Sequence, residues 1–247
     1  MKINPIHHHK LNNINFKSFS IYFCDNVPEP DEFVQSSDDI DFIKLKNLNI
    51  SHFRLVDSKS VRGATLANHN PIILKEIKNS GIDKVIDLRS ESNDTSKYAE
   101  ACRQNGLDYI NFKLNLNMPV FNPQFADKLP PQERKENIHS FIQKLPYFFK
   151  LMECGKYYMA CCLGLHRTDL AVTMNYLANP KEPSAPPVLS HIYLDGEENY
   201  TNKYIAAIKN LIRNLSKKDK KFLDLPDNFN KNFHSRIAKL RAVNLVK

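Results

Sequence analysis

The chain has 247 residues, and its 35 lysines and arginines against 27 aspartates and glutamates give a formal net charge of +8. Its apolar runs are shorter than the roughly 18 to 20 residues that cross a bilayer, and its first residues lack the apolar core of a secretion signal. We therefore expect no membrane span and no cleaved signal. Five scattered cysteines argue against a disulfide scaffold and indicate a reducing compartment, either the cytoplasm or a host cell into which the protein is delivered.

The charge is concentrated at one end of the chain. Residues 201–247 hold 12 lysines and arginines against 3 acidic residues, whereas residues 1–200 are almost neutral. A basic segment of this kind fits an acidic partner as well as a solvated helix surface. We expect no nucleic-acid partner.

In chain order, the first predicted element is an extended lead-in over residues 1–50, where short apolar pieces alternate with proline and acidic clusters. Helix-like stretches then end at Gly81 and Gly106, and each precedes an apolar run, which is the pattern of a helix C-cap followed by a strand. Two such joints predict an α/β core over residues 51–179, with a central, mostly parallel sheet flanked by helices. Gly63 is interpreted as a turn residue.

The last part of the chain, residues 180–247, begins with a proline-rich connection that no helix or central strand can pass through. The basic segment beyond it carries apolar residues at helical spacing. We predict C-terminal helices that pack on the same domain.

The strongest chemical signal lies around Gly164. Residues 157–161 read as a short apolar strand and residues 169–177 as a helix, so a tight loop joins a strand to a helix N-terminus. Backbone N–H groups and the helix dipole make such a loop a binding site for an anion. The loop begins with the thiol of Cys161 and ends with the guanidinium of Arg167.

These residue types fit phosphoryl transfer. A cysteine among N–H donors at a helix N-terminus has a lowered pKa and can attack phosphorus as a thiolate. Arg167 can bind two phosphoryl oxygens bidentately, Gly164 lets the backbone turn its amides inward, and the Thr168 hydroxyl can stabilise the thiolate as a leaving group. This chemistry needs no metal and no cofactor.

Cys161, Gly164, Arg167 and Thr168 match, in order and spacing, the C-x-x-G-x-x-R-[ST] signature of cysteine-based protein tyrosine and dual-specificity phosphatases, and this stretch resembles their phosphate loop. The resemblance implies hydrolysis of phosphotyrosine, or also of phosphoserine and phosphothreonine, on a protein substrate. It also implies phosphate binding by the loop residues Cys162, Leu163, Gly164, Leu165, His166 and Arg167.

A second element upstream is similar to the opening of the compact, atypical dual-specificity phosphatases. It consists of Arg62 and Gly63, then a helix, then a strand that ends with Asp87 and Arg89. Together the two similarities span residues 53–177, about half of the chain.

Two positions depart from the family pattern. Ala160 stands where a histidine usually precedes the nucleophile and helps to lower its pKa, so we expect the thiolate to form at higher pH than in typical relatives. Asp169 stands where a small residue is common, and its carboxylate would repel phosphate.

The general acid is the third departure. The family usually protonates the leaving oxygen with an aspartate some 30 to 40 residues before the nucleophile. Asn115 and Asn117 stand where that acid is first expected, and asparagine cannot donate such a proton. Asp127 is the first candidate for the acid and Glu133 the second, with no protein acid as the third possibility.

Other functions remain open at this point. The same fold could serve as an inactive phosphate-binding scaffold, or the enzyme could act on inositol phosphates, although the loop has no lysine for additional phosphates. A rhodanese-type sulfurtransferase usually has a shorter loop. A zinc site is disfavoured because the spacing of Cys154, Cys161, Cys162 and His166 lacks a C-x2–4-C knuckle. We interpret Cys24, Cys102 and Cys154 as small buried side chains.

Overall fold

The computed structural model describes residues 40–66, 70–90, 95–181, 185–189 and 200–244. The predicted lead-in over residues 1–50 falls outside the described residues as far as residue 39. From there it is partly helical rather than extended, because Asp41 caps the helix α1 (Phe42–Lys46) by accepting a hydrogen bond from the Lys44 N–H at 2.9 Å. The side chain of Leu45 is fully buried and anchors this helix to the core.

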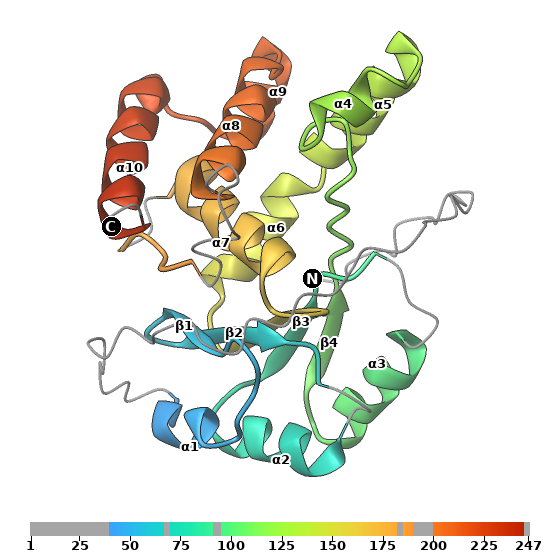
Figure 1. Ribbon diagram of the computed structural model, residues 1–247, viewed down its shortest axis with the longest axis vertical. Helices are drawn as coiled ribbons and strands as arrows, with labels where there is room; N and C mark the ends of the chain where they lie inside the picture. Colours follow the sequence, from blue (N-terminus) through green and yellow to red (C-terminus); the bar gives the residue numbers. More distant parts are fainter. Residues whose placement is uncertain (1–39, 67–69, 91–94, 182–184, 190–199, 245–247) are drawn as a thin grey trace. The chain divides into compact units, whose positions relative to one another are not determined.

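Within the described residues, one five-stranded sheet runs in the order β1-β2-β5-β3-β4 (Figure 1). Its strands are β1 (Arg54–Asp57), β2 (Ser60–Ala64), β3 (Lys84–Asp87), β4 (Asp108–Asn111) and β5 (Tyr157–Cys161). Only β1 and β2 pair antiparallel, and the other three pairs are parallel. The predicted central, mostly parallel sheet with flanking helices is therefore confirmed.

The glycine joints explain how the parallel pairs arise. Gly81 and Gly106 adopt left-handed backbone angles, with φ of 93° and 70°, and end the helices that precede β3 and β4. A side chain is strained in that conformation, whereas glycine adopts it freely. The central strand β5 is buried along its whole length, as expected for a parallel strand with helices on both faces.

Helices cover both faces of the sheet. Figure 1 shows α1, α2 (Pro71–Asn79) and α3 (Thr95–Gln104) on one face and the remaining helices on the other. The second group consists of α4 (Pro123–Ala126), α5 (Pro131–Ile142), α6 (Leu145–Glu153), α7 (His166–Ala178), α8 (Tyr200–Arg213), α9 (Lys217–Phe222) and α10 (Phe229–Asn244). Each face has its own cluster of buried apolar side chains.

Helix α7 lies at the centre of the larger helical layer. Ten of its 13 residues are buried, and it packs against β5, α8 and α10. The buried Arg236 on α10 donates hydrogen bonds to two carbonyls at the C-terminal end of α7, those of Tyr176 at 3.2 Å and Asn179 at 2.7 Å. The C-terminal helices thus pack directly on the helix that follows Cys161.

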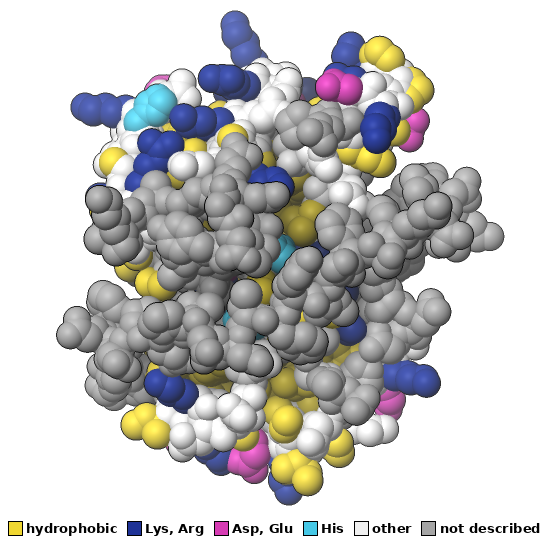
Figure 2. All heavy atoms as spheres, viewed as in Figure 1, with side chains coloured by type: hydrophobic (Ala, Val, Ile, Leu, Met, Phe, Trp, Pro, Cys, Tyr) yellow, Lys and Arg dark blue, Asp and Glu magenta, His cyan; other side chains and the backbone are white. Residues whose placement is uncertain are grey.

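The basic C-terminal segment forms α8, α9 and α10. Figure 2 shows Lys and Arg side chains in the upper part of the view, over α9 and α10. The four lysines of α9 are exposed, whereas its aspartate, Asp219, accepts hydrogen bonds from Ser216 in the helix cap. In the described part of the chain, no helix combines the length and the apolar character of a membrane span.

Candidate active site

Cys161 is the last residue of the central strand β5, and its side chain is 4% exposed. Hydrogen bonds from both neighbouring strands fix the end of β5. The Thr65 N–H donates to the Cys161 carbonyl at 2.6 Å, and the Leu88 N–H donates to the Ala160 carbonyl at 2.8 Å. The thiol therefore lies at the carboxyl edge of a parallel sheet, where ligands bind in open α/β folds.

Helix α7 begins five residues after Cys161, so the predicted strand, loop and helix are present. Arg167 is the second residue of α7, and its side chain is half-buried. The Thr168 hydroxyl lies 4.0 Å from the Cys161 sulfur and donates a hydrogen bond to the Leu165 carbonyl at 2.9 Å. Cys161 and Thr168 thus come together as the sequence predicts.

The backbone between Cys161 and α7 presents N–H donors just before the helix begins. The N-cap residue of α7, Leu165, supplies no side-chain cap. Within the described part of the chain, the N–H groups of Leu163, Gly164 and Leu165 donate to no protein acceptor. An anion bound at the loop would accept hydrogen bonds from such N–H groups, and the dipole of α7 would stabilise its negative charge.

Gly164 is required by both its backbone angle and its surroundings. Its φ is 72°, and a Cβ at this position would lie 2.3 Å from the Gly63 carbonyl carbon and 2.4 Å from the Ala64 nitrogen. The sequence analysis interpreted Gly63 as a turn residue, but the structure places it in β2, where an added Cβ would lie 2.8 Å from the Tyr158 hydroxyl. The Tyr158 hydroxyl donates to the Ala64 carbonyl beside this contact and ties β5 to β2.

The sequence indicated that Asp169 adds a negative charge to the loop, but in the structure this charge is paired. It is fully buried in the first turn of α7 and forms an ion pair with Arg62, which is also fully buried. The guanidinium neutralises the carboxylate, so the expected repulsion of phosphate does not follow. The sequence held a signal for this pair, because Arg62 is a charged residue within a short strand, but nothing in it identified the partner.

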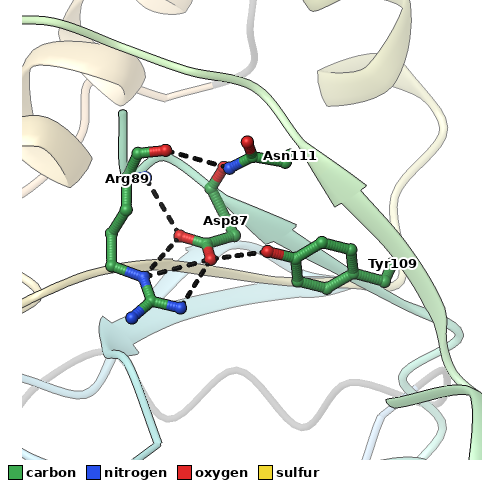
Figure 3. Close-up of polar contacts among 4 residues, drawn as sticks. All are labelled: Asp87, Arg89, Tyr109 and Asn111. Carbon is green, nitrogen blue, oxygen red and sulfur yellow. Dashed lines mark hydrogen bonds and ion pairs between the residues drawn. The ribbon is translucent and has the colours of Figure 1, made fainter. Parts of the chain in front are cut away.

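A second buried network lies at the end of β3, next to the nucleophile's strand. Asp87 pairs with Ala160 across the sheet and binds Arg89 through its Nε and Nη2 groups at 2.8 to 3.1 Å (Figure 3). The Tyr109 hydroxyl donates to the same carboxylate at 2.7 Å, and the Asn111 amide donates to the carbonyls of Asp87 and Arg89. Burial and the nearby Asp87 carboxylate raise the pKa of Tyr109, so it remains a donor.

This network has a structural role. It holds β3, β4 and the segment after β3 together at the edge of the sheet where Cys161 lies. Ala160, fully buried beside it, offers no side-chain hydrogen bond to the loop.

The two predicted acids, Asp127 and Glu133, are exposed side chains. Asn115 occupies the segment after β4, where its side chain accepts a hydrogen bond from the Asn117 N–H at 2.9 Å. Asp127 follows α4, is 78% exposed at its side chain and lies 3.7 Å from Arg134. Glu133, in the first turn of α5, is also exposed. Figure 1 shows α4 and α5 away from the junction of β5 and α7.

The other cysteines differ in exposure. Cys102 is buried as predicted, and desolvation raises the pKa of its thiol to about 12. Cys154 was expected to be buried but is exposed, because it follows the last turn of α6, and Cys162 is exposed as well. Cys24 lies outside the described residues. Among the residues that the structure describes, no three His, Cys, Asp or Glu side chains form a group that could hold a metal ion.

No protein-family model matches the sequence, and no curated protein does. Solved structures give matches at low identity. One is a candidate phosphatase of the DUF442 group from Shewanella putrefaciens, with 14% identity, a TM-score of 0.45 and coverage of 70% of this chain and 97% of the other.

Two further matches have similar coverage. The core catalytic domain of the PP-IP phosphatase SIW14 from S. cerevisiae has 12% identity and a TM-score of 0.35, covering 77% of this chain and 95% of that one. The kinase associated phosphatase has 15% identity and a TM-score of 0.32, covering 78% and 93%. Because these TM-scores lie below 0.5, we base the function on the residues of the 161–167 loop instead.

Proposed function

We propose that this protein is a phosphatase that hydrolyses phosphate monoesters through a covalent phosphocysteine on Cys161. One observation carries the proposal. A thiol at the end of the central strand lies beside a helix N-terminus, the preceding N–H groups of Leu163, Gly164 and Leu165 donate to no acceptor among the described residues, and the Thr168 hydroxyl is 4.0 Å from the sulfur. A sulfur in this position can attack a phosphoryl group that the neighbouring N–H groups hold.

In the first step the Cys161 thiolate attacks phosphorus in line with the ester oxygen. An S–P bond forms while the P–O ester bond breaks, and the ester oxygen leaves with the bonding electron pair. The N–H groups of Leu163, Gly164 and Leu165 and the guanidinium of Arg167 stabilise the charge on the three equatorial oxygens.

In the second step water attacks the phosphocysteine. A P–O bond forms, the S–P bond breaks, and the thiolate returns together with inorganic phosphate. The Thr168 hydroxyl, which now donates to the Leu165 carbonyl, can rotate to donate to the departing sulfur, since the two atoms are already 4.0 Å apart. Thr168 therefore assists the breakdown of the intermediate rather than its formation.

Among the described residues, the two predicted acids, Asp127 and Glu133, are exposed, and the buried Asp169 carboxylate after the loop is paired with Arg62. Asp127 is ion-paired with Arg134 at the surface, and asparagines follow β4. Proton donation by a positioned acid usually contributes on the order of 10²- to 10⁴-fold to such a reaction. We therefore propose that the enzyme prefers esters with leaving groups of low pKa, and among protein substrates phosphotyrosine over phosphoserine.

The variable positions of the loop support a single phosphoryl group as the substrate. Cys162, Leu163, Leu165 and His166 include no lysine or arginine. Additional phosphates of an inositol phosphate would need further cations at the loop. A phosphorylated protein side chain is the substrate class that these residues fit best.

The test is hydrolysis of an aryl phosphate by the purified protein in the presence of a chelator. We expect turnover without metal, no turnover in Cys161→Ser with retained vanadate binding, and loss of both in Arg167→Ala. Unchanged turnover in Cys161→Ser would exclude the mechanism. Vanadate binding without turnover in the wild-type protein would instead identify a phosphate-binding scaffold.

A further inference from the structure

The ion pair between Arg62 and Asp169 connects the loop to a distant part of the chain. Both side chains are fully buried, and each comes from an element that borders the loop, β2 for Arg62 and the first turn of α7 for Asp169. The Asp169 N–H donates to the Leu165 carbonyl at 2.8 Å, so Asp169 also closes the first turn of the helix. Its position therefore influences where Leu165 and the preceding amides lie.

Arg62 has a second partner beyond the loop. Its Nη2 group donates to the carbonyl of Val188, in the segment that follows α7. That segment has no regular secondary structure of its own between residues 185 and 189. The orientation of the guanidinium thus depends on how these residues are held.

Helix α10 holds them through its last residue. The Asn244 side chain accepts a hydrogen bond from the Leu189 N–H at 2.8 Å and donates one to the Pro187 carbonyl at 2.8 Å. It therefore binds the backbone on both sides of Val188. Asn244 is 5% exposed. A continuous series of contacts therefore runs from α10 through Val188 and Arg62 to Asp169.

We propose that Arg62 and Asp169 are positioning residues for the 161–167 loop and that Asn244 on α10 sets their geometry. This inference rests on the proposed phosphatase function. It adds a residue that positions the loop, Asn244, from outside residues 53–177, the part of the chain with the family resemblance. The bidentate shape of a guanidinium explains the arrangement, because one nitrogen can bind the carboxylate while another binds the carbonyl. A neutral residue could fill the space but could not fix both partners.

The first experiment separates positioning from stability. Breaking a buried pair by a single substitution destabilises a protein strongly, whereas replacing both partners with apolar residues is often neutral. The double variant Arg62→Met/Asp169→Leu should therefore remain folded by circular dichroism and melt close to the wild-type temperature. We expect its kcat to fall on the order of 10- to 100-fold, and its affinity for vanadate to weaken, because the loop amides lose their fixed position. A folded double variant with wild-type kcat and vanadate affinity would overturn the positioning role.

The second experiment leaves the ion pair intact and removes the two hydrogen bonds from Asn244 on α10 to the backbone of Pro187 and Leu189. Asn244→Ala should speed hydrogen exchange of the amides in the first turn of α7 by about tenfold and lower kcat more than it changes KM. Asn214→Ala is the matched control. Asn214 directly follows α8, and its side chain donates to the carbonyl four residues earlier at 2.8 Å, compared with 3.0 Å for the same bond of Asn244. The Asn214 side chain bonds no other described segment.

Exchange is measured without catalysis, so the two proposals can fail separately. If the wild-type protein shows no turnover, the phosphatase function fails, while exchange and vanadate affinity still test the positioning. Unchanged exchange at the start of α7 in Asn244→Ala would overturn the role of α10. It would do so even if the double variant failed to fold.

Discussion

Replacing Gly164 with alanine tests the geometry of the loop at one atom. The added Cβ would lie 2.3 Å from the Gly63 carbonyl carbon, whereas ordinary contact begins at 3.4 Å, so the loop or β2 must move by about 1 Å. The left-handed φ of 72° costs an alanine roughly 1–2 kcal/mol, and overpacking against backbone adds about 1–3 kcal/mol. We expect Gly164→Ala to lose about 2–5 kcal/mol of stability and on the order of 100-fold in kcat/KM.

Gly106→Ala provides the matched control. Gly106 has nearly the same angle, 70°, but the nearest atom to its added Cβ is the flexible end of Lys78 at 3.9 Å. It should therefore lose only the roughly 1–2 kcal/mol of the backbone strain, a decrease in Tm of about 2–8 °C, with unchanged kcat/KM. The measurements are the Tm of the two variants by thermal denaturation and their kcat/KM for an aryl phosphate. If Gly164→Ala melts no lower than Gly106→Ala and keeps full activity, the close approach of the loop to β2 is refuted.

Three further predictions concern single groups. Asp127→Asn should change kcat/KM by less than about threefold on both a phosphotyrosine peptide and an activated aryl phosphate, and a selective loss of 10²-fold or more on the peptide would show that Asp127 is the acid. Iodoacetamide at pH 8 should label Cys154 and Cys162 and spare Cys102, and labelling of native Cys102 would contradict its burial. The pKa of Cys102 is about 12 in the folded protein and 9.0 ordinarily, so its contribution to stability is present below pH 9 and is lost as the pH rises toward 12. The free energy of unfolding of Cys102→Ala should therefore decrease less between pH 9 and pH 12 than that of the wild-type protein.

Most of the fold could be predicted from local chemistry. Gly81 and Gly106 marked the two helix-to-strand joints, and the apolar run before Cys161 marked the central strand, because helix caps and buried parallel strands leave signals in a few adjacent residues. The prediction at Cys154 was wrong because the burial of a residue at a helix end depends on packing that no local pattern encodes.

Only part of the candidate site could be predicted from the sequence. The loop residues follow from their spacing, since a strand, a loop and a helix are local. The partner of Asp169 could not be predicted, because Arg62 lies 107 positions away and only the pairing of β2 with β5 brings it beside α7. The same holds for Asn244, which acts on the loop through Val188 and is remote from it in sequence.

The most direct test of the account is to trap the covalent intermediate. The wild-type enzyme is mixed with an aryl phosphate, stopped within milliseconds in alkaline denaturant, digested and analysed by mass spectrometry. We expect a phosphoryl group on the peptide that contains Cys161, assigned to the sulfur, and a larger amount in Thr168→Ala because breakdown of the intermediate is slowed. A phosphoryl group on another residue, such as His166, or steady turnover by Cys161→Ser would contradict the account.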